Sequence, residues 1–230
     1  MIGIIGAMEE EVAIIKEFMD VEKVVEKASM SFVKGRLCGK DVVVVRSGIG
    51  KVNAAVCAQI LVDVFNVDML INTGVAGSLD ASIDIGDIVV STDAVQHDMD
   101  VTALGDPLGQ VPRMDTFAFP ADKRLVELAV LANKEANPGI QTFTGRVVSG
   151  DKFISSNEDK ECLVSVFGGK CAEMEGASIA HVAYLNNVAC VIIRAISDKA
   201  DNSATMDYPE FEKRAIAQSV KLMQNLVARI

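Results

Sequence analysis

The residues Ala172-Glu173-Met174-Glu175-Gly176-Ala177 are the stretch of this chain that indicates its fold. They end one apolar segment, and one helix further on a second apolar segment, Val188-Ala189-Cys190-Val191-Ile192-Ile193, leads into Arg194-Ala195-Ile196-Ser197-Asp198. Both segments are typical of buried strands, and both end in carboxylates. A carboxylate is costly to bury at a strand end unless it has a function. Because ligands of open α/β sheets bind beyond the carboxyl ends of the strands, Glu175 and Asp198 are the first candidate site residues.

The remaining segments predict a single α/β domain. Apolar, β-rich runs predict strands at residues 2–6, 31–37, 41–46, 69–72, 87–95 and 141–149. Helical patterns begin at Met8 and Asp207 and cover residues 52–65, 121–136 and 158–167. Strands and helices therefore alternate, without an internal repeat, linker or low-complexity segment. This order predicts one domain over residues 1–230, with a mostly parallel or mixed sheet.

The acidic balance of the chain limits its partners. There are 22 Lys and Arg against 32 Asp and Glu, a net charge of −10, and no basic run. Such a surface repels polyanions, so we expect neither nucleic acid nor an acidic membrane as a partner. A hydrophobic fraction of 50% is ordinary for a folded globule. A small neutral or cationic ligand fits this charge better.

Cysteine and histidine usage favours a cytoplasmic protein without a metal centre. The five cysteines are scattered and lack C-x-x-C spacing, which is typical of reduced, mostly buried thiols. The only histidines, His97 and His181, lie far apart, so a zinc site or a Ser-His-Asp triad has few residues to draw on. No apolar run approaches the roughly 18 residues of a membrane span. Residues 1–6 lack the basic region of a signal peptide, so we expect a soluble, cytoplasmic protein.

Three loop segments leave alternatives open. Ser47-Gly48-Ile49-Gly50-Lys51 could hold phosphate, but G-x-G alone is weak evidence and a tight turn with glycines at positive φ is favoured. The long loop at residues 96–120 begins with His97-Asp98-Met99-Asp100, for which a hydrogen-bonded loop anchor is favoured over a metal cluster. Phe153 and Ile154 follow a predicted strand end, where they could sandwich a planar ring or equally be core residues under a loop.

Three acids stand at strand-to-helix junctions, namely Glu11, Glu175 and Asp198. Glu9 and Glu10 are explained by the positive end of the helix dipole, whereas Glu11 lies one turn in and could face the crevice. Carboxylates clustered in an apolar crevice have shifted proton affinities. One can then act as a base toward water while another donates a proton, which is the division of labour that cleavage of a glycosidic bond requires. This chemistry needs no metal and no cofactor.

The same residues carry a resemblance to a known family. Six motifs match in order: Gly3-Ile4-Ile5-Gly6-Ala7-Met8-Glu9-Glu10-Glu11, Ser47-Gly48-Ile49-Gly50-Lys51-Val52, Asn72-Thr73-Gly74-x-Ala76-Gly77, Val148-Ser149-Gly150-Asp151-x-Phe153-Ile154, Glu173-Met174-Glu175 and Arg194-Ala195-Ile196-Ser197-Asp198. They resemble the 5'-methylthioadenosine/S-adenosylhomocysteine nucleosidases of the purine nucleoside phosphorylase superfamily. The resemblance covers nearly the whole chain. It implies a three-layer domain with a mixed, partly closed central sheet flanked by helices, in a homodimer that hydrolyses the N-glycosidic bond of 5'-thioadenosines and releases adenine.

The resemblance also implies roles for individual residues. Glu11 resembles the base that activates water, and Asp198 the acid that assists protonation of adenine N7. Glu175, with Met174 beside it, resembles the carboxylate that accepts the ribose hydroxyls. The resemblance further implies that Phe153 stacks on the adenine and that the Ile154 backbone forms a hydrogen bond with the adenine edge. It implies that Ser197 and Arg194 support Asp198 and that Tyr208 forms an aromatic wall. The remaining implied substrate contacts are Met8, Ile49 and Val75.

Two departures from the family pattern leave the preferred substrate open. Leu104-Gly105-Asp106-Pro107-Leu108 stands where members carry an aromatic-rich loop, and Val75 stands where Ser is frequent. Deoxyadenosine or aminofutalosine-like nucleosides therefore remain alternative substrates. A phosphorylase of the same superfamily is the nearest alternative function. It is disfavoured because phosphate needs basic donors, and the motifs at Glu11 and Gly74 supply none. A non-catalytic nucleoside-binding protein is the second alternative, although it would not need the three acids.

Overall fold

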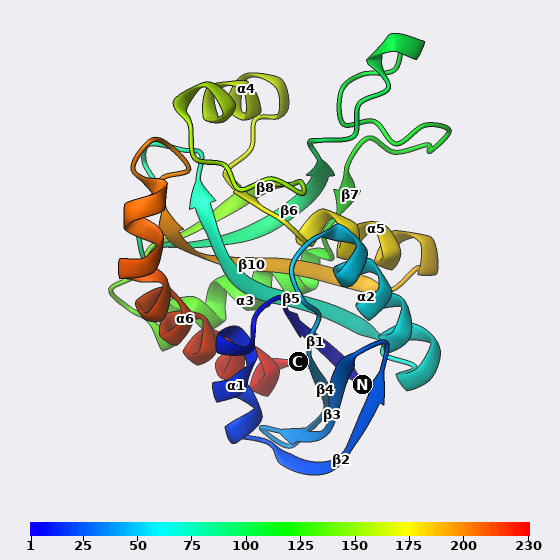
Figure 1. Ribbon diagram of the computed structural model, residues 1–230. Helices are drawn as coiled ribbons and strands as arrows, with labels where there is room; N and C mark the ends of the chain where they lie inside the picture. Colours follow the sequence, from blue (N-terminus) through cyan, green and yellow to red (C-terminus); the bar gives the residue numbers. More distant parts are fainter.

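A mixed sheet of ten strands forms the centre of the computed structural model, which describes the backbone of residues 1–230 and every side chain except those of residues 206, 209 and 210 (Figure 1). The strands are β1 (Ile2–Gly6), β2 (Asp20–Lys27), β3 (Met30–Leu37), β4 (Lys40–Arg46), β5 (Met69–Ser78), β6 (Ile88–Gln96), β7 (Phe119–Pro120), β8 (Thr142–Ser149), β9 (Cys171–Glu173) and β10 (Ala189–Asp198). The helices are α1 (Glu9–Glu17), α2 (Lys51–Phe65), the short 3₁₀ helix η1 (Thr102–Leu104), α3 (Lys123–Ala136), α4 (Asn157–Phe167), α5 (Gly176–Asn186) and α6 (Ala204–Arg229).

Part of the sheet closes on itself. The strand order is β10-β6-β8-β9-β5-β1-β4-β3-β2, with β7 paired to β6, and β10 also pairs with β5. Strands β5, β10, β6, β8 and β9 therefore form a ring, from which β1 to β4 extend as an open sheet. Strands β1, β4, β5 and β10 run parallel to one another, whereas β6 and β9 run antiparallel to their neighbours in that set. The prediction of a mixed, partly closed sheet is confirmed.

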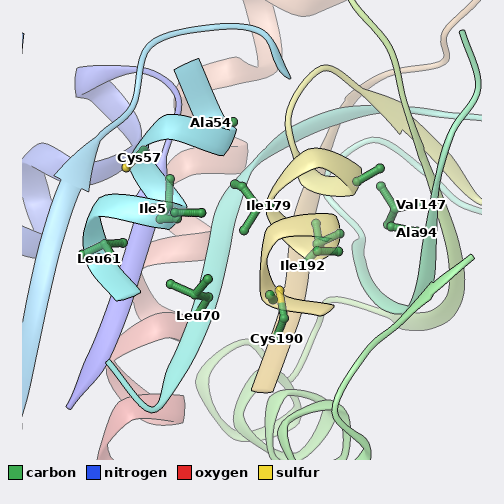
Figure 2. Close-up of a cluster of buried hydrophobic side chains, with 14 of the residues drawn as sticks. Ile5, Ala54, Cys57, Leu61, Leu70, Ala94, Val147, Ile179, Cys190 and Ile192 are labelled. Carbon is green, nitrogen blue, oxygen red and sulfur yellow. The ribbon is translucent and has the colours of Figure 1, made fainter. Parts of the chain in front are cut away.

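Two helical layers bury opposite faces of the sheet, which explains why the strands are apolar without alternation. Helices α2 and α5 lie side by side on one face, where Ile5, Leu70 and Ile192 pack against them (Figures 1 and 2). Helices α1, α3 and α6 cover the other face, where Ile4 and Ile71 point. Neighbouring strand residues thus serve different layers, and the three-layer prediction is confirmed.

Most predicted elements are present; α6 begins three residues earlier than predicted, the predicted loop at residues 96–120 contains η1 and β7, and two strands differ. Strand β2 was not predicted, because its residues are nearly all exposed and show no apolar face; it pairs antiparallel with β3. Strand β5 was predicted to end at Asn72 but continues to Ser78, because its second half pairs with β10 and β9. Among the described residues, no helix is both long and apolar enough to span a membrane.

Candidate active site

A cavity of about 270 Å³ lies at the carboxyl ends of the parallel strands β1, β4, β5 and β10. Small residues, namely Ala7, Ala76, Gly77 and Ala172, form part of its wall. Ten of the twelve residues predicted from the sequence also line it: Met8, Glu11, Ile49, Val75, Phe153, Met174, Glu175, Ser197, Asp198 and Tyr208. The fold therefore brings together carboxylates that are up to 187 positions apart in the chain, Glu11 and Asp198.

Glu11 is buried in the first turn of α1 and is held by backbone donors. Its Oε2 accepts the N–H groups of Ala7 at 2.7 Å and Met8 at 2.9 Å, and its Oε1 accepts the N–H of Val75 at 3.2 Å. Burial raises the pKa of Glu11, although these N–H groups and the positive charge of Arg194 act in the opposite direction. The carboxylate is thus fixed in position and binds a proton more readily than an exposed glutamate.

Asp198 ends β10 on another side of the cavity and is also fixed. The Ser197 hydroxyl donates to Asp198 Oδ2 at 2.9 Å, and the N–H of Ala200 donates to Oδ1 at 2.8 Å. Burial raises the pKa of Asp198, and the negative charges of Asp207 and Asp201 add to the rise, although the two hydrogen bonds oppose it. An aspartate with a raised pKa is suited to hold a proton that it can donate. The predicted support of Asp198 by Ser197 is confirmed.

Two glycines of β5 make room for these carboxylates. A Cβ at Gly74 would lie 2.5 Å from Glu11 Oε1, and a Cβ at Gly77 would lie 2.6 Å from Asp198 Oδ1. The two glycines are three residues apart, which corresponds to about 10 Å along a strand. The acids therefore approach the same strand at separate points, and both line the cavity.

Glu175 is the third carboxylate of the cavity and follows β9. Its Oε1 accepts the N–H of Gly50 at 2.8 Å, which joins it to the turn after β4. Burial and the nearby charge of Glu173 raise the pKa of Glu175 to about 7. The turn itself adopts the predicted positive φ at Gly48 and Gly50, 85° and 93°. Glycine is required there because other residues rarely adopt these angles.

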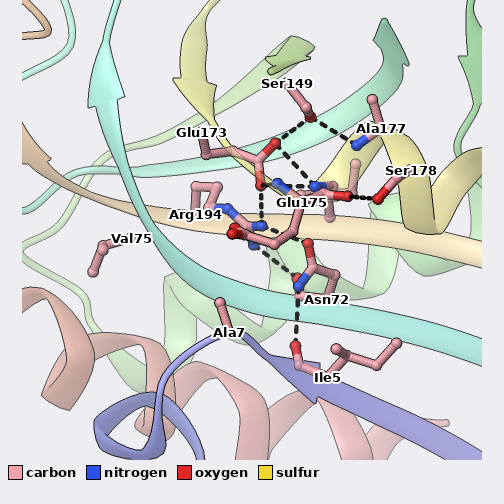
Figure 3. Close-up of polar contacts among 12 residues, drawn as sticks. Ile5, Ala7, Asn72, Val75, Ser149, Glu173, Glu175, Ala177, Ser178 and Arg194 are labelled. Carbon is pink, nitrogen blue, oxygen red and sulfur yellow. Dashed lines mark hydrogen bonds and ion pairs between the residues drawn. The ribbon is translucent and has the colours of Figure 1, made fainter. Parts of the chain in front are cut away.

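A buried polar network lies beneath Glu175 (Figure 3). The Arg194 guanidinium donates to the Glu173 carboxylate and to the side-chain oxygen of Asn72, whose amide donates to the Ile5 carbonyl at 3.0 Å. Glu173 also accepts the N–H groups of Glu175 and Gly176 at the start of α5. The prediction that Arg194 holds Asp198 is therefore wrong: a fully buried arginine must pair with the nearest buried carboxylate, which is Glu173. Glu173 thus supports the site through its contacts with Arg194 and with the start of α5.

The charge of Arg194 balances the acids around it. Burial disfavours the charged guanidinium, but the carboxylates of Glu173, Glu175 and Glu11 outweigh this effect and raise the pKa of Arg194. The residue is 1% exposed and does not line the cavity. It acts on the site through its charge and through the position of Glu173.

The side chains of Phe153 and Ile154, in the segment that follows β8, point to different sides. Phe153 lines the cavity, is 43% exposed, and meets Tyr208 edge to face with ring centroids 6.0 Å apart. Ile154 points the other way, because its side chain packs in a core cluster with Val95 and Leu163. The core alternative therefore describes the Ile154 side chain, and the ring-stacking hypothesis stays a prediction for Phe153 alone.

Sequence reasoning missed several residues that shape the site. Gly74 and Gly77 give the carboxylates space, Gly50 donates to Glu175, and Asn72 and Ser149 complete the network around Glu173. The three glycines lie in glycine-containing motifs at predicted strand ends, and these motifs are the sequence signal that could have identified them. The favoured interpretation of residues 97–100 is confirmed, since Asp98 and Asp100 accept hydrogen bonds that anchor their loop.

Comparison with known proteins places the chain in a family. A family model described as the phosphorylase superfamily matches residues 1–230. The 5'-methylthioadenosine/S-adenosylhomocysteine nucleosidase of Staphylococcus saprophyticus is 42% identical, with both chains covered completely. The chain therefore belongs to the phosphorylase superfamily and, within it, to the 5'-methylthioadenosine/S-adenosylhomocysteine nucleosidases.

Solved structures agree with this assignment. The Neisseria meningitidis nucleosidase of the same name, in complex with methylthio-immucillin-A, superposes with a TM-score of 0.95 at 40% identity, covering 100% of this chain and 99% of the other. The Colwellia psychrerythraea enzyme, in complex with adenine, gives a TM-score of 0.94 at 41% identity, covering 99% and 94%. The nucleoside phosphorylase-like fold predicted from the motifs is thus confirmed.

Proposed function

We propose that this chain hydrolyses the N-glycosidic bond of 5'-methylthioadenosine and S-adenosylhomocysteine and releases adenine and the 5'-thioribose. One observation carries the proposal: three buried carboxylates with raised pKa, Glu11, Glu175 and Asp198, surround a single cavity at the strand ends. The names of the full-length relatives and the adenine complex of one of them support the same substrate class. The whole chain, residues 1–230, would act as one nucleosidase domain.

The two catalytic acids have complementary tasks in this reaction. Asp198, whose raised pKa favours the form that carries a proton, donates that proton to adenine N7 as the bond between C1' and N9 breaks and its electron pair moves into the base. Positive charge then develops on the ribose, and water attacks C1' while Glu11 accepts the proton that the water loses. The backbone N–H groups that hold Glu11 keep its carboxylate oriented for this step.

The other lining residues bind the nucleoside. Glu175 accepts hydrogen bonds from the ribose hydroxyls, and its negative charge stabilises the positive charge that develops on the sugar. Phe153 stacks on the adenine ring, since it is half-exposed on the cavity wall. Met174, Met8, Ile49, Val75 and Tyr208 complete the apolar wall. The Ile154 backbone is proposed to bind the adenine edge, a role independent of its buried side chain.

Water is favoured over phosphate as the nucleophile because the site has no free cation among its described residues. No Lys or Arg is among the residues that line the cavity, and the nearby Arg194 is paired with Glu173. A phosphate dianion would also meet three carboxylates. Hydrolysis is therefore preferred to the phosphorylase alternative.

The proposal is tested by incubating the protein with methylthioadenosine, S-adenosylhomocysteine, adenosine and inosine, with and without phosphate. Free base is measured by chromatography. We expect adenine release from the two thionucleosides at a rate that phosphate does not change. Dependence on phosphate would support the phosphorylase, and methylthioadenosine binding in a calorimeter without any base release would support the non-catalytic alternative. Adding 5'-deoxyadenosine and an aminofutalosine-like nucleoside to the panel decides the preferred 5'-substituent.

A homodimer is the second part of the proposal. Helices α2 and α5 are joined by amide hydrogen bonds between Gln59 and Asn186. Each helix exposes apolar side chains: Val52 is 75% exposed and Leu185 is 63% exposed. A second copy of the chain would remove this surface from water. Sedimentation of the protein and of a Val52→Lys, Leu185→Lys double variant tests the idea, since the variant should sediment as a monomer.

All five cysteines are free thiols, which fits a reducing compartment such as the cytoplasm.

A further inference from the structure

Three loops beside the candidate active site are joined by a closed triangle of hydrogen bonds. The segments that follow β4, β6 and β8 contribute Lys51, Asp98 and Asp151, respectively. Lys51 Nζ donates to Asp98 Oδ1 at 2.6 Å, and the N–H of Asp151 donates to Asp98 Oδ2 at 2.9 Å. The N–H of Lys51 donates to Asp151 Oδ1 at 2.9 Å and closes the triangle. None of these three residues lines the cavity.

The local backbone is built for these contacts. Lys51 is the first residue of α2, so its N–H has no partner inside the helix, and the Asp151 carboxylate caps this positive helix end. Gly50 precedes it with a φ of 93°, and a Cβ there would lie 3.0 Å from Asp151 Oδ1. Glycine at this position therefore allows the two loops to approach each other.

The triangle is partly shielded from water, which strengthens its ionic contact. The Lys51 side chain is 17% exposed and the Asp98 side chain is 29% exposed. Burial opposes ionisation of Asp98, but the hydrogen bonds from Lys51 and Asp151 prevail and hold its pKa below the usual value. Lys51 Nζ has a second acceptor, Gln96 Oε1 at 3.3 Å. Charge-assisted hydrogen bonds of this kind are about twice as strong as neutral ones.

The triangle adjoins two cavity-lining residues whose side chains are not buried, although the Asn53 amide donates to the Ile49 carbonyl at 2.7 Å and the Phe153 ring meets Tyr208 edge to face. Ile49 lies two residues before Lys51 and is 54% exposed, and Phe153 lies two residues after Asp151 and is 43% exposed. Neither side chain is buried in the core, so the positions of their loops decide how far apart they stand. The N–H of Gly50, next to Lys51, donates to Glu175. The three contacts of the triangle therefore bear on the positions of Ile49 and Phe153, whereas Glu175 is held by the Gly50 N–H, which is not one of these contacts.

We propose that Lys51, Asp98 and Asp151 are positioning residues that form a latch, which holds Ile49 and Phe153 at the spacing that a bound nucleoside requires. This rests on the proposed function for the identity of the ligand. Glu11 and Asp198 lie on α1 and β10, outside the latch. Opening the latch therefore weakens binding and leaves the chemical step nearly intact.

Steady-state kinetics with methylthioadenosine test this separation. Asp98→Ala removes two sides of the triangle, and we expect KM to rise about tenfold or more while kcat changes by less than about threefold. Lys51→Met should raise KM similarly, and Lys51→Arg, which keeps the charge and a donor, should recover most of the loss. Asp41→Ala is the matched control, because Asp41 pairs with Arg36 at an exposed site in the β3–β4 hairpin; it should leave both constants unchanged.

A direct readout of loop position is available because the chain contains no tryptophan. Phe153→Trp places the only indole on the latched loop, and its fluorescence anisotropy reports how firmly the loop is held. We expect Asp98→Ala and Asp98→Asn in this background to lower the anisotropy, and Asp41→Ala to leave it unchanged. This measurement needs no turnover, so it tests the latch even if the wild-type protein releases no adenine.

Two results would overturn the latch. One is an unchanged KM and an unchanged anisotropy in both Asp98 variants. The other is a fall in kcat as large as the rise in KM, which would place the residues in the chemical step or in overall folding. If Asp98→Ala unfolds, the isosteric Asp98→Asn, with circular dichroism and melting temperature matched to wild type, decides the question alone. Failure of adenine release with an intact anisotropy response would refute the proposed function and leave the latch standing.

Discussion

Substituting Gly74 by alanine tests the site geometry without changing any reacting group. Gly74 lies in β5, where it faces the Glu11 carboxylate. The new Cβ would lie 2.5 Å from Glu11 Oε1 and 3.1 Å from Glu11 Cδ. Because an ordinary contact of this kind is about 3.4 Å, the carboxylate must move by about 0.9 Å.

The size of the effect follows from the contacts of Glu11. Its Oε1 accepts the N–H of Val75 at 3.2 Å, already near the long end for a hydrogen bond, so the shift breaks that bond. Misplacement of a catalytic group by about 1 Å reduces turnover by about 100-fold. The lost N–H also stabilised the ionised carboxylate, so the pKa of Glu11 rises further and the acidic limb of the kcat profile moves to higher pH. Overpacking should lower the free energy of unfolding by about 1–3 kcal/mol.

The assay is initial-rate adenine release from methylthioadenosine across pH 5 to about 9, with adenine affinity measured by calorimetry. Gly139→Ala is the matched control, because a Cβ at Gly139 meets nothing within 4 Å. It should match wild type in rate and in melting temperature. Adenine affinity of Gly74→Ala should stay within about threefold of wild type, since Phe153 and Asp198 are not displaced.

The reasoning is refuted if Gly74→Ala keeps kcat within about threefold of wild type and its acidic limb does not move. It also fails if adenine affinity falls as far as kcat, because the damage would then be general and not confined to Glu11.

Three further substitutions give separable outcomes. Asp198→Asn should lower adenine release by about 10³-fold while methylthioadenosine affinity, measured by calorimetry, stays nearly constant, because the lost group acts in the transition state; normal turnover would exclude Asp198 as the acid. Glu175→Gln should weaken substrate binding yet stabilise the unliganded protein at pH 8. The folded protein holds the Glu175 proton up to about pH 7, whereas the unfolded chain loses it near the ordinary glutamate pKa of 4.5, so wild-type stability falls as pH rises through this window. If the melting temperatures of wild type and Glu175→Gln change by the same amount between pH 4.5 and pH 8, this reasoning is contradicted. Glu173→Gln should lower the free energy of unfolding by about 3–5 kcal/mol in urea titrations, because it leaves the buried Arg194 charge without its ion-pair partner, and a loss below about 1 kcal/mol would show that the pair is not needed.

Local patterns were sufficient to predict most elements of this fold. Strands such as β1 and β4 are buried on both faces, so continuous apolar runs identify them without knowledge of their neighbours. Strand β2 escaped prediction because it is exposed and exists through its backbone pairing with β3. The second half of β5 contains Gly74, Ala76, Gly77 and Ser78, which have weak strand preference, and pairing with β10 and β9 imposes its extended conformation.

The candidate site likewise has residues that local sequence patterns predict and contacts that they do not. Glu11, Glu175 and Asp198 could be predicted because a carboxylate at the end of a buried strand stands out in the sequence, and all three line one cavity. The partner of Arg194 could not be predicted, since a long side chain that leaves a strand can reach several acids and only the packing selects Glu173. Likewise, the motif at Ser149-Gly150-Asp151 does not reveal that Asp151 contacts Lys51 and Asp98.

The sequence by itself determined the α/β class, the order of most elements and the three acids, because each depends on residues close together in the chain. Only the tertiary structure decided the ring formed when β10 pairs with β5, the space that Gly74 and Gly77 leave for two carboxylates, and the latch that joins three loops. The physical reason is that closure of the sheet brings together groups far apart in sequence. Their distances, and hence their pKa values and contacts, exist only once the ring has formed.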